Sequence, residues 1–70
     1  MNIPKLRAKM VEKEITGTKM AEILGISHTA FSNKMRQVSQ FTQREMSTIA
    51  KTLDLSIDEI SDIFFARDVS

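Results

Sequence analysis

The sequence contains no cysteine and a single histidine, His28. Without cysteine the chain forms neither a disulfide framework nor a thiolate metal site, a composition that suits a reducing cytosol. His28 has no second histidine, and no acidic residue stands at a spacing that suggests a metal cage or a catalytic triad. The residues therefore indicate no catalytic site, no metal site and no cofactor, and we expect a protein that is not an enzyme.

Long apolar runs are also missing. No stretch approaches the ~18 apolar residues of a membrane span. The first ten residues carry Lys5, Arg7 and Lys9 but lack the apolar segment of a signal peptide. There is no linker or low-complexity tract, and 70 residues suffice for one domain, 1–70. We expect one soluble, cytoplasmic domain without a membrane partner.

Gly25 stands between two short segments whose apolar residues recur with the helical period. Thr16 is an N-cap candidate for the first segment, Gly25 supplies a left-handed turn at its end, and Ser27 restarts a second helix. The small Ala21, four positions before the glycine, lets the two helices pack closely at a steep angle. Residues 16–36 therefore have the sequence form of a helix-turn-helix, whose second helix is shaped to enter a DNA major groove.

A repeated cap pattern divides the rest of the chain into helices. A Ser or Thr is preceded by an apolar residue and followed four positions later by another, which fits a hydrophobic staple across an N-cap. The four instances are Ile15-Thr16-Met20, Ile26-Ser27-Phe31, Phe41-Thr42-Met46 and Leu55-Ser56-Ile60, and Glu45 and Glu59 complete capping boxes at the last two. With a first helix after Asn2-Ile3-Pro4, the pattern predicts helices over 3–14, 17–24, 28–36, 43–53 and 57–65.

Apolar residues recur in these segments with the helical period, and no segment alternates long enough to be a strand. The predicted core residues are Leu6, Met10, Val11, Met20, Ala21, Leu24, Phe31, Met35, Met46, Ile49, Ala50, Leu53, Ile57, Ile60, Ile63 and Phe64. We therefore expect an all-α fold, a compact five-helix domain whose second and third helices form the helix-turn-helix.

The net charge of +1 is unevenly distributed. Residues 1–40 hold seven basic and three acidic residues, which gives +4, and residues 41–70 hold three basic and six acidic residues, which gives −3. The basic half contains the helix-turn-helix, a polarity expected of a DNA-facing module.

The two helices of the helix-turn-helix have no acidic residue in their first turns. Lys19 is locally unfavourable near a helix N-terminus, unless a phosphate binds there to Lys19 and the free backbone N–H groups. The alternative is that Lys19 is an ordinary solvated surface residue.

The predicted helix 28–36 has a polar face opposite Phe31 and Met35. This face carries four short hydrogen-bonding side chains suited to base edges, His28, Thr29, Ser32 and Asn33. Lys34 and Arg36 would hold flanking phosphates, although a plain solvent-exposed face remains the alternative.

The helix-turn-helix residues match a known pattern. The series Thr16-x-x-x-Met20-Ala21-x-x-Leu24-Gly25-Ile26-Ser27-x-x-x-Phe31-Ser32 resembles the lambda-repressor-like, Cro-type helix-turn-helix domain, and the resemblance extends over residues 5–65. The combination of Phe31-Ser32-Asn33-Lys34-Met35, Phe41-Thr42 and Ile63-Phe64-Phe65 is similar to small regulators of the genetic switch of temperate phages of Gram-positive bacteria.

This resemblance implies a set of DNA contacts and a bacterial host cytoplasm. His28, Thr29 and Asn33 fall where the family reads bases, and the implied phosphate-binding residues are Thr16, Gly17, Thr18, Lys19, Lys34, Arg36 and Arg44. Two positions depart from the family pattern. Gly17 stands where glutamine is frequent, and Arg36-Gln37-Val38 stands where the family turns on a glycine.

Two functional hypotheses follow. In the first, the protein is a phage-type transcriptional regulator that binds double-stranded operator DNA as a homodimer, with Phe65 and Val69 on the dimer or partner surface. In the alternative, the protein is an anti-repressor or modulator that keeps the fold but binds the phage repressor protein. The near-neutral charge, Gly17 and the missing glycine after the 28–36 helix favour the alternative.

Overall fold

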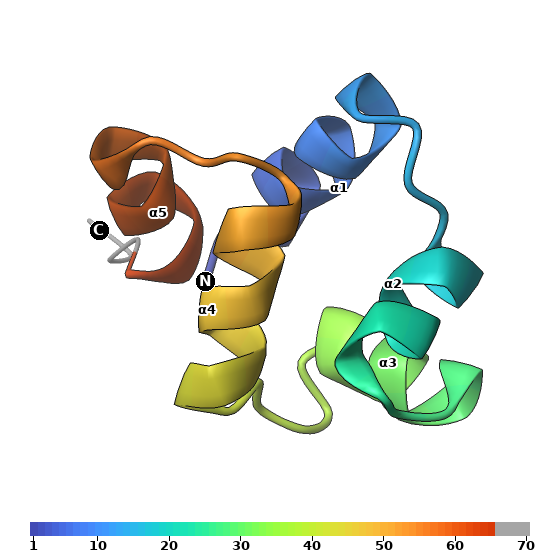
Figure 1. Ribbon diagram of the computed structural model, residues 1–70. Helices are drawn as coiled ribbons and strands as arrows, with labels where there is room; N and C mark the ends of the chain where they lie inside the picture. Colours follow the sequence, from blue (N-terminus) through green and yellow to red (C-terminus); the bar gives the residue numbers. More distant parts are fainter. Residues whose placement is uncertain (66–70) are drawn as a thin grey trace.

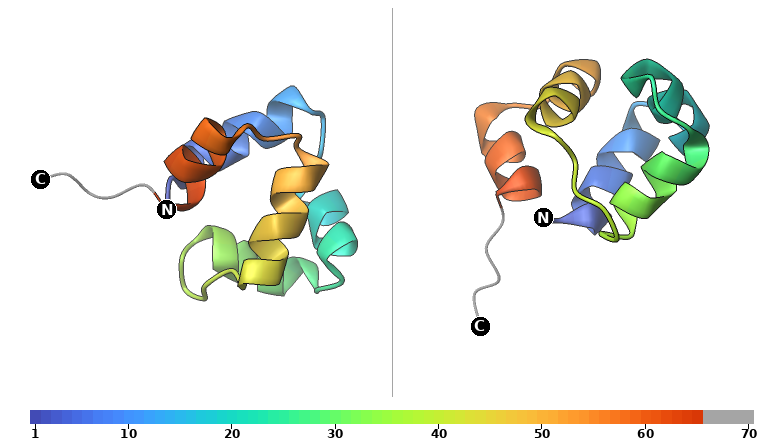
Figure 2. Two further views of the ribbon diagram at one scale, coloured as in Figure 1. Left: turned by 60° about the vertical axis from the view of Figure 1, so that its left-hand side comes forward. Right: turned by 90° about the horizontal axis from the view of Figure 1, so that it is seen from below.

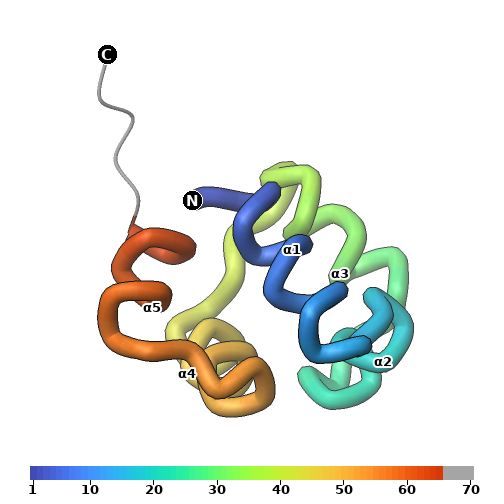
Figure 3. The backbone as a smooth tube through the Cα atoms, turned by 90° about the horizontal axis from the view of Figure 1, so that it is seen from above, coloured from blue at the N-terminus to red at the C-terminus, as the bar shows by residue number. Residues whose placement is uncertain are grey.

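The computed structural model describes residues 1–65, and these residues form five helices and no strand. The helices are α1 (Ile3–Glu12), α2 (Gly17–Leu24), α3 (His28–Met35), α4 (Gln43–Thr52) and α5 (Ile57–Phe64). Helix α4 stands between α5 on one side and the α2–α3 pair on the other (Figure 1), and the view from below also shows α5 and this pair on opposite sides of the domain (Figure 2). The tube view shows α1 between α5 and the α2–α3 pair (Figure 3). The predicted all-α fold and the order of its helices are confirmed.

Each helix begins at a side-chain cap. The caps are Asn2, Thr16, Ser27, Thr42 and Ser56, and each side-chain oxygen accepts a hydrogen bond from the backbone N–H three residues later, at 3.0–3.1 Å. Glu45 and Glu59 return the bond to the cap backbone, so both predicted capping boxes are present. Such a cap contributes ~1 kcal/mol of stability, a meaningful share for a domain of this size.

The first four helices end in one common way. Each end has a residue with a positive φ, which is the C-cap itself in α2 and the residue after the C-cap in the other three helices. These residues are Glu14 (56°), Gly25 (71°), Gln37 (60°) and Asp54 (52°). The next backbone N–H then bonds the carbonyl five residues earlier: Ile15 to Met10, Ile26 to Ala21, Val38 to Asn33 and Leu55 to Ala50, at 2.8–3.0 Å. This is the Schellman arrangement, which satisfies carbonyls that the helix itself leaves free. The predicted helices 3–14, 28–36 and 43–53 therefore end one or two residues earlier than expected. The predicted helix 57–65, which has no such turn, ends one residue earlier at Phe64.

Three of these ends run directly into the next cap. The tripeptides Glu14-Ile15-Thr16, Gly25-Ile26-Ser27 and Asp54-Leu55-Ser56 each hold a left-handed residue, an apolar residue and an N-cap. The apolar members Ile15, Ile26 and Leu55 are half-buried and pack against the core. One short connector thus closes one helix, opens the next and fixes both to the core.

Twelve apolar residues are buried, and they come from all five helices and from the segments directly before and after α4. They are Ile3, Leu6, Met10, Met20, Ala21, Phe31, Met35, Phe41, Ile49, Leu53, Ile63 and Phe64. The predicted core residues Leu24, Met46, Ala50 and Ile60 are half-buried against this core. Ile3 and Phe41 are buried although the helical pattern did not assign them to the core.

The predicted burial of Val11 and Ile57 is wrong. Val11 is 74% exposed because Ile3, Leu6 and Met10 set the inward face of α1, and the next position turns away from that face. Ile57 is 85% exposed because it opens α5 at a point that no other described element covers.

Ion pairs and a backbone bond join the two ends of the described chain. Lys9 Nζ lies 2.7 Å from a carboxylate oxygen of Glu59, and Lys5 Nζ lies 2.8 Å from one of Asp62. The backbone N–H of Asn2 donates to the carbonyl of Ile63 at 2.7 Å. The hydrogen bond from Lys9, reinforced by the backbone N–H of Ser56, lowers the pKa of Glu59 to about 2. Helix α1 is therefore held to α5 by charge as well as by apolar contact.

We expect the α1–α5 attachment to weaken in acid. A carboxyl whose pKa falls from 4.5 to about 2 on folding stabilises the native state above pH 4.5, and this contribution disappears as the pH falls towards 2. Thermal unfolding followed by circular dichroism should show the largest difference between the wild type and Glu59→Gln at pH 7, and a much smaller one at pH 2. An equal difference at both values would contradict the assignment.

The left-handed residues give a second prediction. Glu14 holds a positive φ at the cost of a side-chain clash that glycine lacks, so Glu14→Gly should raise the free energy of unfolding by about 1 kcal/mol. The matched control is Ala8→Gly, an exposed position inside α1, which should lower it by about 1 kcal/mol. Urea denaturation of the three proteins measures both, and a loss of stability in Glu14→Gly would refute the argument.

Candidate nucleic-acid interface

The turn between α2 and α3 has the geometry that the sequence predicted. Gly25 adopts φ 71° and ψ 29°, its N–H donates to the carbonyl of Glu22, and the N–H of Ile26 donates to that of Ala21. Ala21 is buried, and α2 packs directly on both α3 and α4. Residues 16–36 thus form a helix-turn-helix whose second helix is held from behind by Phe31 and Met35.

The outer face of α3 presents all four predicted base-reading side chains. His28 and Thr29 are exposed, and Ser32 and Asn33 are half-exposed. Among residues 1–65 no side-chain hydrogen bond or ion pair occupies any of the four. Their donors and acceptors are consequently available to a ligand.

The four side chains do not share one environment. His28 and Ser32 line a shallow hollow of about 200 Å³ together with Arg7 of α1 and Gly17 of α2. Thr29 and Asn33 lie farther round the helix, opposite Phe31 and Met35. Arg7, an exposed cation beside His28, was not among the predicted contacts, because nothing in the sequence connects α1 with the start of α3.

The start of α2 lies beside the start of α3. A Cβ placed on Gly17 would lie 3.6 Å from His28 Nε2 and 3.5 Å from the Phe31 ring. Thr16, Thr18 and Lys19, the other predicted phosphate contacts of this segment, are exposed. The structure thus brings the free N–H groups at the N-terminus of α2 next to the base-reading candidate His28. Because 3.5 Å is an ordinary contact distance, sterics do not demand glycine at position 17.

Lys34 has a different environment from the other predicted phosphate contacts. Its side chain is only 14% exposed, and Nζ lies 3.1 Å from Glu45 Oε1 and 3.0 Å from the carbonyl oxygen of Gln40. The ammonium also lies 6.0 Å from the centre of the Phe41 ring, and Phe41 meets Phe31 edge to face. We call Lys34, Gln40, Phe41 and Glu45 the α3–α4 clamp.

The clamp joins the end of α3 to the capping box of α4. Burial alone would raise the pKa of Glu45, but the backbone N–H of Thr42 and the ammonium of Lys34 outweigh burial and lower that pKa. The same carboxylate oxygen, Oε1, accepts from Thr42 N at 2.8 Å and from Lys34. Lys34 is therefore already engaged inside the domain, whereas Arg36 and Arg44 are exposed and form no ion pair among residues 1–65.

The segment after α3 resolves one of the two departures from the family pattern. Gln37 takes the positive φ that a glycine would supply there, and the Schellman bond from Val38 N to Asn33 O is formed. Without glycine, the left-handed residue at the end of α3 is energetically less favourable, but the Schellman turn still forms.

A comparison with protein families matches residues 5–65 to the Cro/C1-type HTH DNA-binding domain. The chain belongs to this family. No curated protein and no solved structure matches it. The family is one of DNA-binding regulatory domains, which agrees with the free polar face of α3. Among residues 1–65, no helix of this Cro/C1-type domain is both long and apolar enough to cross a membrane.

Two predicted contacts lie at or beyond the end of the described chain. Phe65 is 64% exposed and follows α5 directly. Val69 lies outside the described residues.

The clamp predicts a stability effect where the sequence suggested a DNA contact. Lys34→Met removes the ammonium and leaves the Glu45 carboxylate half-buried with one partner fewer, which should lower the free energy of unfolding by about 1–2 kcal/mol. Arg36→Met, on an exposed neighbour, should change it by less than about 0.5 kcal/mol. Urea denaturation measures both, and equal effects would show that the clamp adds nothing to stability.

Proposed function

We propose that this Cro/C1-type domain is a transcriptional regulator that reads operator DNA with α3 in the major groove. The observation that carries the proposal is the unoccupied polar face of α3, which has no acidic residue in its first turn. Such a face can approach the negatively charged duplex without repulsion and still offer hydrogen bonds to base edges.

Each group on this side of the domain fits one part of duplex recognition. The Asn33 amide can bond adenine with two hydrogen bonds, and the Thr29 methyl group can contact the thymine methyl. His28 and Ser32 offer single hydrogen bonds from the side of α3 that faces α1. The backbone N–H groups of Gly17 and Thr18, which the Thr16 cap leaves free, and the side chain of Lys19 fit one phosphate. The exposed cations Arg36 and Arg44 fit others.

The proposed biological setting is a lysis/lysogeny switch of a temperate phage of Gram-positive bacteria, within the host cytoplasm. Its support is the resemblance of Phe31–Met35, Phe41-Thr42 and Ile63–Phe65 to small regulators of that kind. Operator binding as a homodimer goes with this proposal, since a single small module makes few contacts and two modules can span half-sites ~34 Å apart.

One observation favours a second candidate function, a modulator that docks on the phage repressor protein. Lys34 and Arg36 were the cations predicted to flank α3, and the Lys34 ammonium is committed to Glu45. A domain with fewer cations free to bind phosphates holds DNA less tightly, because these cations supply most of the binding that does not depend on sequence. In this alternative the same polar face of α3 would meet a protein surface.

Selection of random duplexes by the purified protein tests the proposal, with fluorescence anisotropy of the selected duplexes at two salt concentrations. Enrichment of a half-site, with affinity that falls steeply as salt rises, supports sequence reading. Absence of enrichment at low salt would overturn it, and co-purification with a repressor encoded beside the protein would then support the modulator.

Substitutions on the same face separate base contacts from phosphate contacts. Asn33→Ala should cost ~1–3 kcal/mol on the selected duplex and relax the preference at one base pair. Arg36→Ala should weaken all duplexes evenly and reduce the salt slope by ~1. Val38→Ala, at an exposed position without polar atoms, is the control and should change neither. A uniform loss of affinity in Asn33→Ala would contradict its role in reading a base.

A further inference from the structure

The hollow of about 200 Å³ between α1 and α3 is lined by two ionisable side chains, Arg7 and His28. Figures 2 and 3 both show α1 alongside α3, and the hollow lies where the two helices meet. Its other lining residues carry no charge: Met10, Gly17, Phe31, Ser32 and Met35. Among residues 1–65, no carboxylate lines the hollow, and both ionisable side chains are exposed.

The imidazole of His28 is directed toward α2 and not toward the face that carries Thr29 and Asn33. Its Nε2 lies 3.6 Å from the position of a Cβ on Gly17, the first residue of α2. Gly17 has no side chain that could cover this nitrogen. His28 precedes Ser32 by four positions, so both lie on the side of α3 next to α1. The hydrogen-bonding end of the imidazole therefore lies beside the outward face of α3, where the edge of a groove would pass, and not on that face.

Arg7 is the cation of α1 that has no acidic partner among residues 1–65. Lys5 pairs with Asp62, and Lys9 pairs with Glu59. Arg7 stands two positions from each lysine, which turns it to the opposite side of the helix. It takes part in no ion pair and in no side-chain hydrogen bond within the described chain. Its guanidinium donors are therefore available to an anion.

We propose that His28 and Arg7 together bind one phosphate of the DNA backbone, and that His28 does so in its protonated form. Two cations that share a hollow without a carboxylate repel each other, and an anion between them removes that repulsion. A phosphate oxygen can accept from the imidazolium Nε2–H while another accepts from the guanidinium. The first turn of α2 adds no acidic residue and one further cation, Lys19. This role rests on the proposed function, and it takes His28 out of the group that reads bases.

A protonated histidine in this place makes duplex binding depend on pH. Histidine is the side chain whose charge ordinarily changes between pH 5 and 8. A phosphate favours the imidazolium over the neutral imidazole, so the bound complex holds more protons than the free protein, and affinity rises as the pH falls. The fold persists over this range, because the pKa of Glu45 is lowered and that of Glu59 is about 2.

The first test measures affinity of the full chain for a random-sequence duplex by fluorescence anisotropy at constant ionic strength. The wild type should bind at least about fivefold more tightly at pH ~5.5 than at pH ~7.5. His28→Gln keeps a hydrogen-bonding side chain without a charge, so it should lose this dependence and stay within about twofold of the wild type at pH ~7.5. Circular dichroism checks that the helices persist. Equal pH dependence in the two proteins would overturn the proposal.

Arg7 is tested against a matched cation of the same segment. Arg7→Gln should weaken binding of the random-sequence duplex at least about threefold at both pH values, because a phosphate contact does not depend on sequence. Lys13→Gln, at an exposed cation that does not line the hollow, should change the affinity by less than about twofold. Equal effects of the two substitutions would overturn the role of Arg7.

NMR observes His28 directly, because it is the only histidine of the chain. The midpoint of its Cε1–H titration should rise by at least about 0.7 pH unit when the duplex is added, which matches a fivefold change in affinity. Inorganic phosphate alone, at the concentration of duplex phosphate, should leave the midpoint unchanged. An equal rise with inorganic phosphate would overturn the duplex as the ligand.

A duplex obtained by selection separates a phosphate contact from a base contact. Methylphosphonate, which carries no charge, replaces one phosphate at a time. At one position it should abolish the pH dependence of the wild type, whereas base-pair changes should preserve it. The reverse pattern would show that His28 reads a base. Half-site enrichment with an affinity independent of pH would overturn this site and leave sequence reading intact. A pH-dependent affinity for random duplexes without enrichment would support the site and overturn sequence reading.

Discussion

The fold of this domain depends on short connectors, each of which closes one helix and caps the start of the next. A helix leaves four N–H groups at its start and four carbonyls at its end without partners, and a small domain has little chain in which to satisfy them. Between α1 and α2, between α2 and α3, and between α4 and α5, a left-handed residue, an apolar residue and a hydroxyl cap perform both tasks. The connector at Gly25 sets the angle between α2 and α3, and therefore the direction in which α3 presents its polar face.

The connection between α3 and α4 is the exception, and its form matters for function. Val38 completes the Schellman bond of α3 but is 66% exposed, and the chain needs three more residues to reach the Thr42 cap. The α3–α4 clamp replaces the missing connector: Phe41 packs on Phe31 from inside, and Lys34 bonds Glu45 from outside. Lys34, which the sequence suggests as a phosphate contact, thus holds α3 in position, and its ammonium is already paired with the Glu45 carboxylate.

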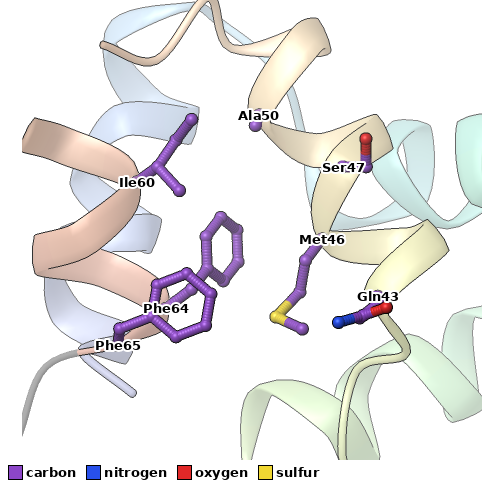
Figure 4. A pocket seen from close by; sticks show the side chains of 7 residues that line it. All are labelled: Gln43, Met46, Ser47, Ala50, Ile60, Phe64 and Phe65. Carbon is purple, nitrogen blue, oxygen red and sulfur yellow. The ribbon is translucent and has the colours of Figure 1, made fainter. Parts of the chain in front are cut away.

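Helix α4 separates two surfaces of the domain. One side of α4 supports the α2–α3 pair, and the other side forms an apolar groove with α5. Met46, Ala50, Ile60, Phe64 and Phe65 line this groove (Figure 4). The pairs Lys5–Asp62 and Lys9–Glu59 hold α5 to α1 and thereby fix the α5 side of the groove. The polar face of α3 and the apolar groove therefore lie on different sides of α4.

Much of this domain was predictable from the sequence because it depends on interactions between residues close together in the chain. A cap is a contact between residues three positions apart, and a turn glycine acts on its own φ, so the five helices, both capping boxes and the left-handed Gly25 followed from nearest neighbours. The face of α3 that Phe31 and Met35 leave outward was predictable for the same reason. Exposure, however, depends on whether another element covers a face. Only the tertiary structure could decide that Val11 and Ile57 face solvent, that Ile3 and Phe41 are buried, and that Lys34 meets Glu45. These outcomes join residues distant in the chain, and no local spacing encodes the packing that brings them together.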